Sequence, residues 1–195
     1  MKRIDIIMIV VFVLLVLLGA YLFLIKPNIK NDSLKFSEEY NLEDKENIFV
    51  YKTTEEIIKI LENGTGVVYL GFPECPWCVE YVKYLNEVAK DSDISKIYYK
   101  NILNDRKENT KEYQKIVEIL SNHLQYDEEG NKKIYVPAVI VVNNGIIVGF
   151  DDETAYDTKG FQTPKEYWEN ESLENFKTKL NSMFKNLNNT CTKCN

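Results

Sequence analysis

The chain has 195 residues, of which 45% are hydrophobic, and this leaves room for one domain with a sizeable core. Its formal net charge is −6. The first 30 residues carry four basic side chains and one acidic side chain, so the rest of the chain is more negative still. An acidic globule repels phosphate groups and anionic lipid heads, so we do not expect this protein to bind nucleic acid.

The first thirty residues contain a long apolar run with a basic start. The twenty residues from Ile6 to Ile25 carry no charge, which is long enough for a helix to cross the hydrocarbon core of a membrane. Lys2 and Arg3 precede the run and favour a cytoplasmic N-terminus. A cleaved signal peptide is the competing interpretation, but no small-x-small cleavage site follows the run. We therefore expect an uncleaved transmembrane signal anchor over residues 1–26, with the remaining chain outside the cytoplasm.

Residues 27–47 are polar and charged, and we interpret them as a tether with a short docking helix at its end. Their few apolar anchors are Phe36, Tyr40 and Leu42. The globular domain is expected over residues 48–187. Residues 188–195 are polar and are expected to form a flexible tail.

The domain is expected to begin with a strand over residues 48–51, followed by a helix. Thr53 and Glu56 form a capping-box pattern at the start of this helix, and Asn63-Gly64 ends it. Residues 66–72 are apolar throughout, which is typical of a strand covered on both faces. The remaining patterns predict a helix from residue 76 to about 90, a strand over 94–103, a helix over 111–124, a hairpin of 134–142 and 146–150, and a helix over 173–187.

This order of elements predicts an α/β fold, with a mixed β-sheet flanked by helices on both faces. Pro137 interrupts the pattern of the first hairpin strand, because a proline inside a central strand removes a hydrogen bond of the ladder. A cis peptide bond between Val136 and Pro137, at the start of the strand, resolves this conflict.

Cys75-Pro76-Trp77-Cys78 follows the apolar strand directly. Proline suits the first position of a helix, so we expect Cys75 at a helix N-terminus, where free backbone N–H groups favour its thiolate. Cys78 lies about one turn inside the helix on the same side and is expected to be more buried. These positions indicate that Cys75 attacks a disulfide and Cys78 resolves the mixed disulfide. A static disulfide, or half of a metal site, is the alternative interpretation.

A CxxC motif at a strand-to-helix junction, with a later X-Pro that opens a hairpin, resembles the thioredoxin superfamily over residues 48–187. The segment 69–78, together with Gly64-Thr65-Gly66 and Ile97-Tyr98-Tyr99, resembles more narrowly the membrane-anchored thioredoxin-like proteins of the bacteriocin-transport accessory type. The resemblance implies a thioredoxin-like fold in which Pro137 is cis and packs beside both cysteines. It also implies that Val136 offers its backbone to an extended substrate peptide.

The chain departs from the superfamily six positions before the first cysteine. Relatives usually carry a buried Asp or Glu there, which accepts the proton of the second cysteine, and this chain has Tyr69. Glu74 is a candidate for that proton transfer, although its charge disfavours a thiolate at Cys75. A solvated loop carboxylate is the alternative interpretation of Glu74. Trp77 is expected to offer an aromatic surface to substrates, or else to pack on a neighbouring loop.

A second CxxC, formed by Cys191 and Cys194, lies at the C-terminal end. One hypothesis is that this pair exchanges disulfides with Cys75 and Cys78, as an internal relay or a cap on the active site. A closed or free dithiol without a partner is at least as compatible with the sequence. A four-cysteine zinc site ranks last, because structural zinc motifs place their cysteine pairs roughly 15–20 residues apart and here residues 79–190 intervene.

Together these features predict a single-pass protein of a bacterial cell membrane, with an extracytoplasmic thiol-disulfide oxidoreductase domain. Its expected partners are cysteine-containing exported polypeptides and a redox protein that recycles it. No metal or organic cofactor is expected, because the dithiol carries the electrons. The alternative is a non-catalytic module with the same fold, an accessory protein or chaperone that holds extended peptides at Val136 and Pro137.

Overall fold

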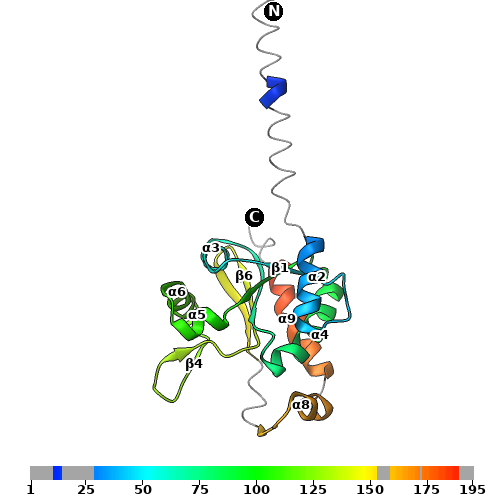
Figure 1. Cartoon of the computed structure of the whole chain (residues 1–195), viewed down its shortest axis with the longest axis vertical. Helices are drawn as coiled ribbons and strands as arrows, with labels where there is room; N and C mark the ends of the chain where they lie inside the picture. Colours follow the sequence, from blue (N-terminus) through cyan, green and yellow to red (C-terminus); the bar gives the residue numbers. More distant parts are fainter. Residues whose placement is uncertain (1–10, 15–28, 153–158, 172, 189–195) are drawn as a thin grey trace, which may run out of the picture.

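A computed structural model describes residues 11–14, 29–152, 159–171 and 173–188 of the chain. They form an α/β fold with a mixed five-stranded sheet and helices on both of its faces (Figure 1). This confirms the fold class predicted from the order of elements. The strands, in their spatial order across the sheet, are β1 (Phe49–Tyr51), β3 (Ile97–Asn101), β2 (Gly66–Gly71), β6 (Ala138–Asn143) and β7 (Ile146–Asp151).

Strand β2 occupies the middle of the sheet. It pairs in parallel with β3, which also pairs in parallel with β1, and it pairs antiparallel with β6, to which β7 adds as the second strand of a hairpin. Residues 67–70 of β2 are completely buried, as their continuous apolar pattern predicted. The C-terminal end of this central strand therefore leads out of the core directly into the CxxC motif.

The helices form two layers around the sheet (Figure 1). Helices α3 (Thr54–Asn63) and α6 (Lys111–Leu120) pack together on one face, and α2 (Ile29–Tyr40), α4 (Pro76–Asp91) and α9 (Leu173–Asn188) lie on the other. The predicted capping box is present at the start of α3, where Thr53 and Glu56 exchange hydrogen bonds. Several short elements were not predicted, namely α5 (Leu103–Glu108), α8 (Pro164–Asn170) and a hairpin of β4 (Gln125–Tyr126) with β5 (Lys132–Lys133).

Residues 29–47 belong to the domain, which corrects the prediction of a polar tether up to residue 47. Helix α2 covers twelve of them. Its Phe36 and Tyr40 are completely buried, and the Phe36 ring stacks on Phe49 of β1 with the centroids 3.8 Å apart. The three apolar anchors predicted in this segment are thus confirmed, but they fix a core helix. The described part of the domain begins with this helix, at residue 29.

Two hydrogen bonds of Asn47 show how the polar part of this segment is held. The buried Asn47 amide donates to the Ser33 carbonyl and to the Ser37 hydroxyl, each at 2.8 Å. Both acceptors lie on α2. Polar residues here therefore satisfy one another inside the fold, which is why composition alone suggested a solvated linker.

The hairpin of β6 and β7 has the predicted Asn-Gly turn. Asn144 and Gly145 both have positive φ, at 48° and 75°, the pattern of a type I′ turn. A Cβ placed on Gly145 would lie 2.1 Å from the Glu62 carbonyl oxygen of α3. Glycine is required here both for its backbone angles and for the close approach of the neighbouring helix.

Most of the predicted signal anchor falls outside the described residues, which include only residues 11–14 of it, in helical conformation with exposed side chains. Among the residues that the structure describes, no helix has both the length and the apolar composition needed for a membrane span. The C-terminal pair, Cys191 and Cys194, also falls outside the described residues.

Candidate functional site

The two cysteines of the first CxxC lie where β2 passes into α4. Cys75 is the N-cap residue of α4 and Pro76 occupies the first helical position, as predicted. The Cys78 backbone N–H donates to the Cys75 Sγ, with nitrogen and sulfur 3.3 Å apart. Cys75 is 9% exposed and Cys78 is completely buried, and both are free thiols. Of the two cysteines, only Cys75 has surface exposed to solvent.

The two thiols differ in acidity. The pKa of Cys75 is lowered to about 7, chiefly by the hydrogen bond from the Cys78 thiol. Burial raises this pKa, whereas the backbone N–H groups of Cys78 and Trp77 and the positive charge of Arg106 lower it further. Burial and the neighbouring Cys75 sulfur raise the pKa of the Cys78 thiol. Cys75 therefore ionises first, near neutral pH, and its thiolate can act as a nucleophile.

Arg106 is a site residue that sequence reasoning missed. It lies on α5, and its guanidinium group is 4.8 Å from the centre of the Phe72 ring at the end of β2. Its positive charge helps to lower the pKa of Cys75. No pattern in the sequence points to Arg106, because the short helix α5 has no buried side chain and hence no apolar periodicity.

The Val136–Pro137 segment lies against Cys75. The peptide bond is cis, as predicted, and it stands immediately before β6. The Cys75 Sγ is 3.9 Å from the Val136 carbonyl oxygen, although 61 positions separate the two residues in the chain. Both Val136 and Pro137 are buried. The structure thus brings together the four residues Cys75, Cys78, Val136 and Pro137.

Trp77, between the cysteines, packs on a neighbouring segment. It is half-buried, and its ring meets Tyr167 of α8 edge-on with the centroids 5.7 Å apart. This is the second of the two interpretations of Trp77. Helix α8 was not predicted, so the sequence could not name the residue that holds the tryptophan.

Pro76 and Glu74 lie on the exposed rim of the site. They line an open groove together with Pro73, Val79, Glu80, Thr163, Pro164 and Lys165. Within the described ranges no hydrogen bond or ion pair joins Glu74 to another residue. Proton transfer through Glu74 stays a prediction.

Tyr69 lies on β2 six positions before Cys75. It is completely buried on β2, and within the described residues its hydroxyl makes no hydrogen bond of regular geometry, although it interacts with the Cys78 thiol and the Tyr40 phenol. Burial, followed by the Cys78 sulfur, raises its pKa, so the phenol stays protonated. The site therefore places a buried, protonated phenol beside the second cysteine.

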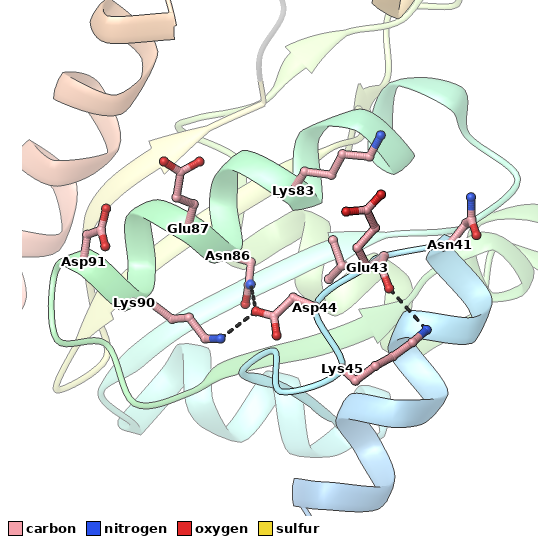
Figure 2. A pocket seen from close by; sticks show the side chains of 10 residues that line it. Asn41, Glu43, Asp44, Lys45, Lys83, Asn86, Glu87, Lys90 and Asp91 are labelled. Atoms are coloured by element: carbon pink, nitrogen blue, oxygen red, sulfur yellow. Dashed lines mark hydrogen bonds and ion pairs between the residues drawn. The ribbon is translucent and has the colours of Figure 1, made fainter.

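A further hollow lies elsewhere, between the connection from α2 to β1 and the second half of α4 (Figure 2). It has a volume of about 870 Å³. Asp44 spans it and accepts hydrogen bonds from Asn86 at 2.7 Å and Lys90 at 2.6 Å, which fastens the connection to α4. Asp44 and Lys90 form an ion pair within it, and its lining contains no cysteine, serine or histidine. The cysteines therefore define the candidate site. The hollow is lined by Asn41, Leu42, Glu43, Asp44, Lys45, Lys83, Asn86, Glu87, Lys90 and Asp91.

Comparison with known proteins adds nothing to this geometry, since no protein-family model, no curated protein and no solved structure matches the chain.

Proposed function

We propose that this protein is a thiol-disulfide oxidoreductase with a thioredoxin-like fold. The observation that carries the proposal is the position of the Cys75 sulfur. It caps α4, has a pKa of about 7, and lies 3.9 Å from the carbonyl oxygen of Val136, just before the cis proline. Cys78 is buried directly behind it.

The arrangement of the sheet supports the thioredoxin-like fold. The strand that precedes the CxxC is central, and the strand that follows the cis proline pairs antiparallel with it. Both catalytic segments consequently meet at one end of the sheet. This is the arrangement implied by the resemblance of the sequence to the superfamily.

The reaction proceeds in two exchanges that balance in atoms and electrons. The Cys75 thiolate attacks a substrate disulfide, a bond forms between Cys75 and one substrate sulfur, and the other substrate sulfur leaves as a thiolate. The Cys78 sulfur then attacks Cys75, the Cys75–Cys78 disulfide forms, and the remaining substrate sulfur leaves. The substrate gains two electrons, which the dithiol loses. Pro76, Trp77, Val136 and Pro137 form the surface against which the substrate lies.

The acidity of Cys75 favours the reducing direction. Strongly oxidising thiol-disulfide oxidoreductases have a nucleophilic cysteine with a pKa of about 3.5 and a reduction potential of about −120 mV. Reducing ones have a pKa of about 7 and a reduction potential of about −270 mV. A pKa of about 7 for Cys75 corresponds to the second group. A thiolate stabilised this weakly gives the reduced form little extra stability.

The cellular setting follows from the sequence. The apolar run with its basic start supports a single-pass anchor in a bacterial cell membrane, with the domain on the outer side. Disulfides persist in that compartment, so exported cysteine-containing polypeptides are the substrate class. A separate redox protein would return the dithiol to its reduced state. The pair Cys191 and Cys194 is a second candidate redox pair.

A disulfide-reduction assay tests the proposal. The full chain is incubated with a peptide disulfide carrying a fluorophore and a quencher, and the release of fluorescence is followed. Cys75→Ala is expected to abolish the reaction, while the double replacement Cys191→Ser and Cys194→Ser retains it. Equal rates for Cys75→Ala and the unmodified chain would refute an exchange reaction at Cys75. Retention of peptide binding with no turnover in either protein would favour a peptide-binding module instead.

The relay hypothesis for the second pair has its own test. In a Cys78→Ala variant, Cys75 has no resolving partner within its own motif. If the relay operates, a peptide linking Cys75 to Cys191 or Cys194 appears in a non-reducing digest analysed by mass spectrometry. Intermolecular adducts alone would contradict the relay and leave the exchange chemistry of Cys75 in place.

A further inference from the structure

The side chain of Tyr69 runs along β2 towards the cysteines. A Cβ placed on Gly71, two residues closer to Cys75, would lie 2.4 Å from the Tyr69 hydroxyl oxygen. The hydroxyl therefore occupies space that any other residue at position 71 would fill. The ring stacks against Tyr81, one turn after Cys78 on α4, with the ring planes 6° apart. Strand and helix together direct the phenol towards the Cys78 thiol.

The Tyr69 hydroxyl differs from its neighbours in making no hydrogen bond of regular geometry within the described residues, although it interacts with the Cys78 thiol and the Tyr40 phenol beside it. The Tyr40 hydroxyl donates to Tyr99 at 3.1 Å, and the Tyr81 hydroxyl donates to the Asp151 carboxylate at 2.6 Å. The Tyr69 hydroxyl is equally buried, but within the described residues no donor or acceptor completes a hydrogen bond with it. Buried polar groups are nearly always paired, so this hydroxyl is free to complete a full hydrogen bond to the Cys78 sulfur when that sulfur becomes charged.

The environment of Cys78 supplies that state. The titratable groups that face its sulfur are the Cys75 thiol of α4 and the phenols of Tyr69 on β2, Tyr40 on α2 and Tyr99 on β3. Burial and the Cys75 sulfur disfavour a thiolate at Cys78, which must nevertheless form when Cys78 attacks. A protonated phenol next to that sulfur is a donor in place for the charge.

We propose that Tyr69 donates a hydrogen bond to the Cys78 sulfur as it becomes a thiolate in the resolving step. The inference rests on the exchange reaction proposed above and deepens it. The Cys78 S–H bond breaks, its sulfur bonds to the Cys75 sulfur, and the bond between Cys75 and the substrate breaks. The departing substrate sulfur takes the electron pair of that bond and receives, through solvent, the proton that Cys78 lost. Tyr69 keeps its own proton throughout, so it acts as a donor and not as a base.

The test compares Tyr69→Phe with Tyr81→Phe in the full chain, each carrying Cys191→Ser and Cys194→Ser. Both variants remove one buried phenol oxygen, and the two rings stack on each other. Rapid mixing with a peptide disulfide, acid quenching and mass spectrometry give separate rates for formation and for resolution of the mixed disulfide, from pH 6 to pH 10.

Tyr69→Phe is expected to form the mixed disulfide at the unmodified rate and to resolve it about tenfold more slowly at pH 7, since a hydrogen bond to a charged group is lost. The pH midpoint of resolution should rise by about one unit. Tyr81→Phe should leave that midpoint unchanged. Should Tyr69→Phe fail to fold, Gly71→Ala provides the second variant, because its Cβ displaces the Tyr69 hydroxyl, and the same rise is expected.

The outcomes separate the two proposals. If the unmodified chain forms no mixed disulfide, the exchange reaction itself is refuted. If the unmodified chain turns over and Tyr69→Phe resolves with the same rate and the same pH midpoint, the exchange reaction stands and the role of Tyr69 is overturned. A rise in the midpoint of equal size in Tyr81→Phe would also overturn it, because general loosening of the core would then explain both.

Discussion

The Cys78 thiol is the group that lowers the pKa of Cys75 most, so Cys78→Ala tests the electrostatics of the site. The variant keeps the backbone N–H groups of residues 77 and 78, so the pKa should rise only part of the way from about 7 to the value of a free cysteine. We expect a Cys75 pKa of roughly 8 in this variant, still below the ~8.5 of a free cysteine. The rise from about 7 to about 8 corresponds to about 1.4 kcal/mol in the free energy of ionisation of Cys75. At pH 7 the thiolate fraction would fall from about one half to about one tenth, and alkylation would slow about fivefold.

The assay is the rate of reaction of Cys75 with iodoacetamide between pH 5 and pH 10, with the modified peptide identified by mass spectrometry. Cys191→Ser and Cys194→Ser are present throughout to leave one reactive motif. Cys78→Ser is the matched control, since its hydroxyl retains a donor where the alanine has none. The serine variant should keep a midpoint nearer to 7 than the alanine variant. A midpoint of about 7 in the alanine variant would show that the helix N-terminus alone sets the acidity.

Three further predictions concern stability. The pKa of Cys75 is lower in the folded protein than the ~8.5 of an unfolded chain, so the free energy of unfolding of the reduced protein should rise by about 1 kcal/mol between pH 6.5 and pH 8 and fall again as the pH drops through about 7. Urea unfolding of the reduced protein, with Cys75→Ser as control, measures this change, and a free energy of unfolding that does not vary with pH would contradict it. Phe36→Ala should lower the free energy of unfolding by about 3–5 kcal/mol because the side chain is completely buried, while Leu34→Ala, at 41% exposure on the same helix, should lower it by no more than about 0.5 kcal/mol. Equal small losses of stability in the two variants would mean that α2 does not belong to the core. Gly145→Ala should lower the melting temperature more than Gly130→Ala, because both glycines have positive φ but only at Gly145 would the new Cβ clash with the backbone of α3. Similar decreases in the melting temperature of the two variants would refute the close approach of α3 to Gly145.

The features predicted correctly from the sequence are those set by local physics. The apolar run of residues 66–72 indicates a strand buried on both faces, and the structure places β2 at the centre of the sheet. Proline at the first helical position fixes Cys75 as a helix cap. The clash between Pro137 and a regular ladder pointed to the cis bond that is present. Each of these inferences needs only a few neighbouring residues.

The features that were missed depend on contacts between distant parts of the chain. Helix α2 looks polar because only a narrow stripe of it is apolar, and its place in the core is decided by Phe49 and the buried phenols. Helix α8 is short, and the packing of Trp77 on Tyr167 has no local signature. The same holds for Arg106, whose effect on Cys75 arises only when α5 folds back beside the end of β2.

Reversible closure of the disulfide between Cys75 and Cys78 is tested most directly by a redox titration. The full chain with Cys191→Ser and Cys194→Ser is equilibrated in glutathione buffers of graded potential, free thiols are alkylated, and the oxidised fraction is read from the mass. We expect one two-electron transition with a midpoint nearer to −270 mV than to −120 mV, the values typical of about pKa 7 and about pKa 3.5 nucleophiles respectively. Cysteines that stay reduced at every potential, or a disulfide that no reductant opens, would contradict the proposed function.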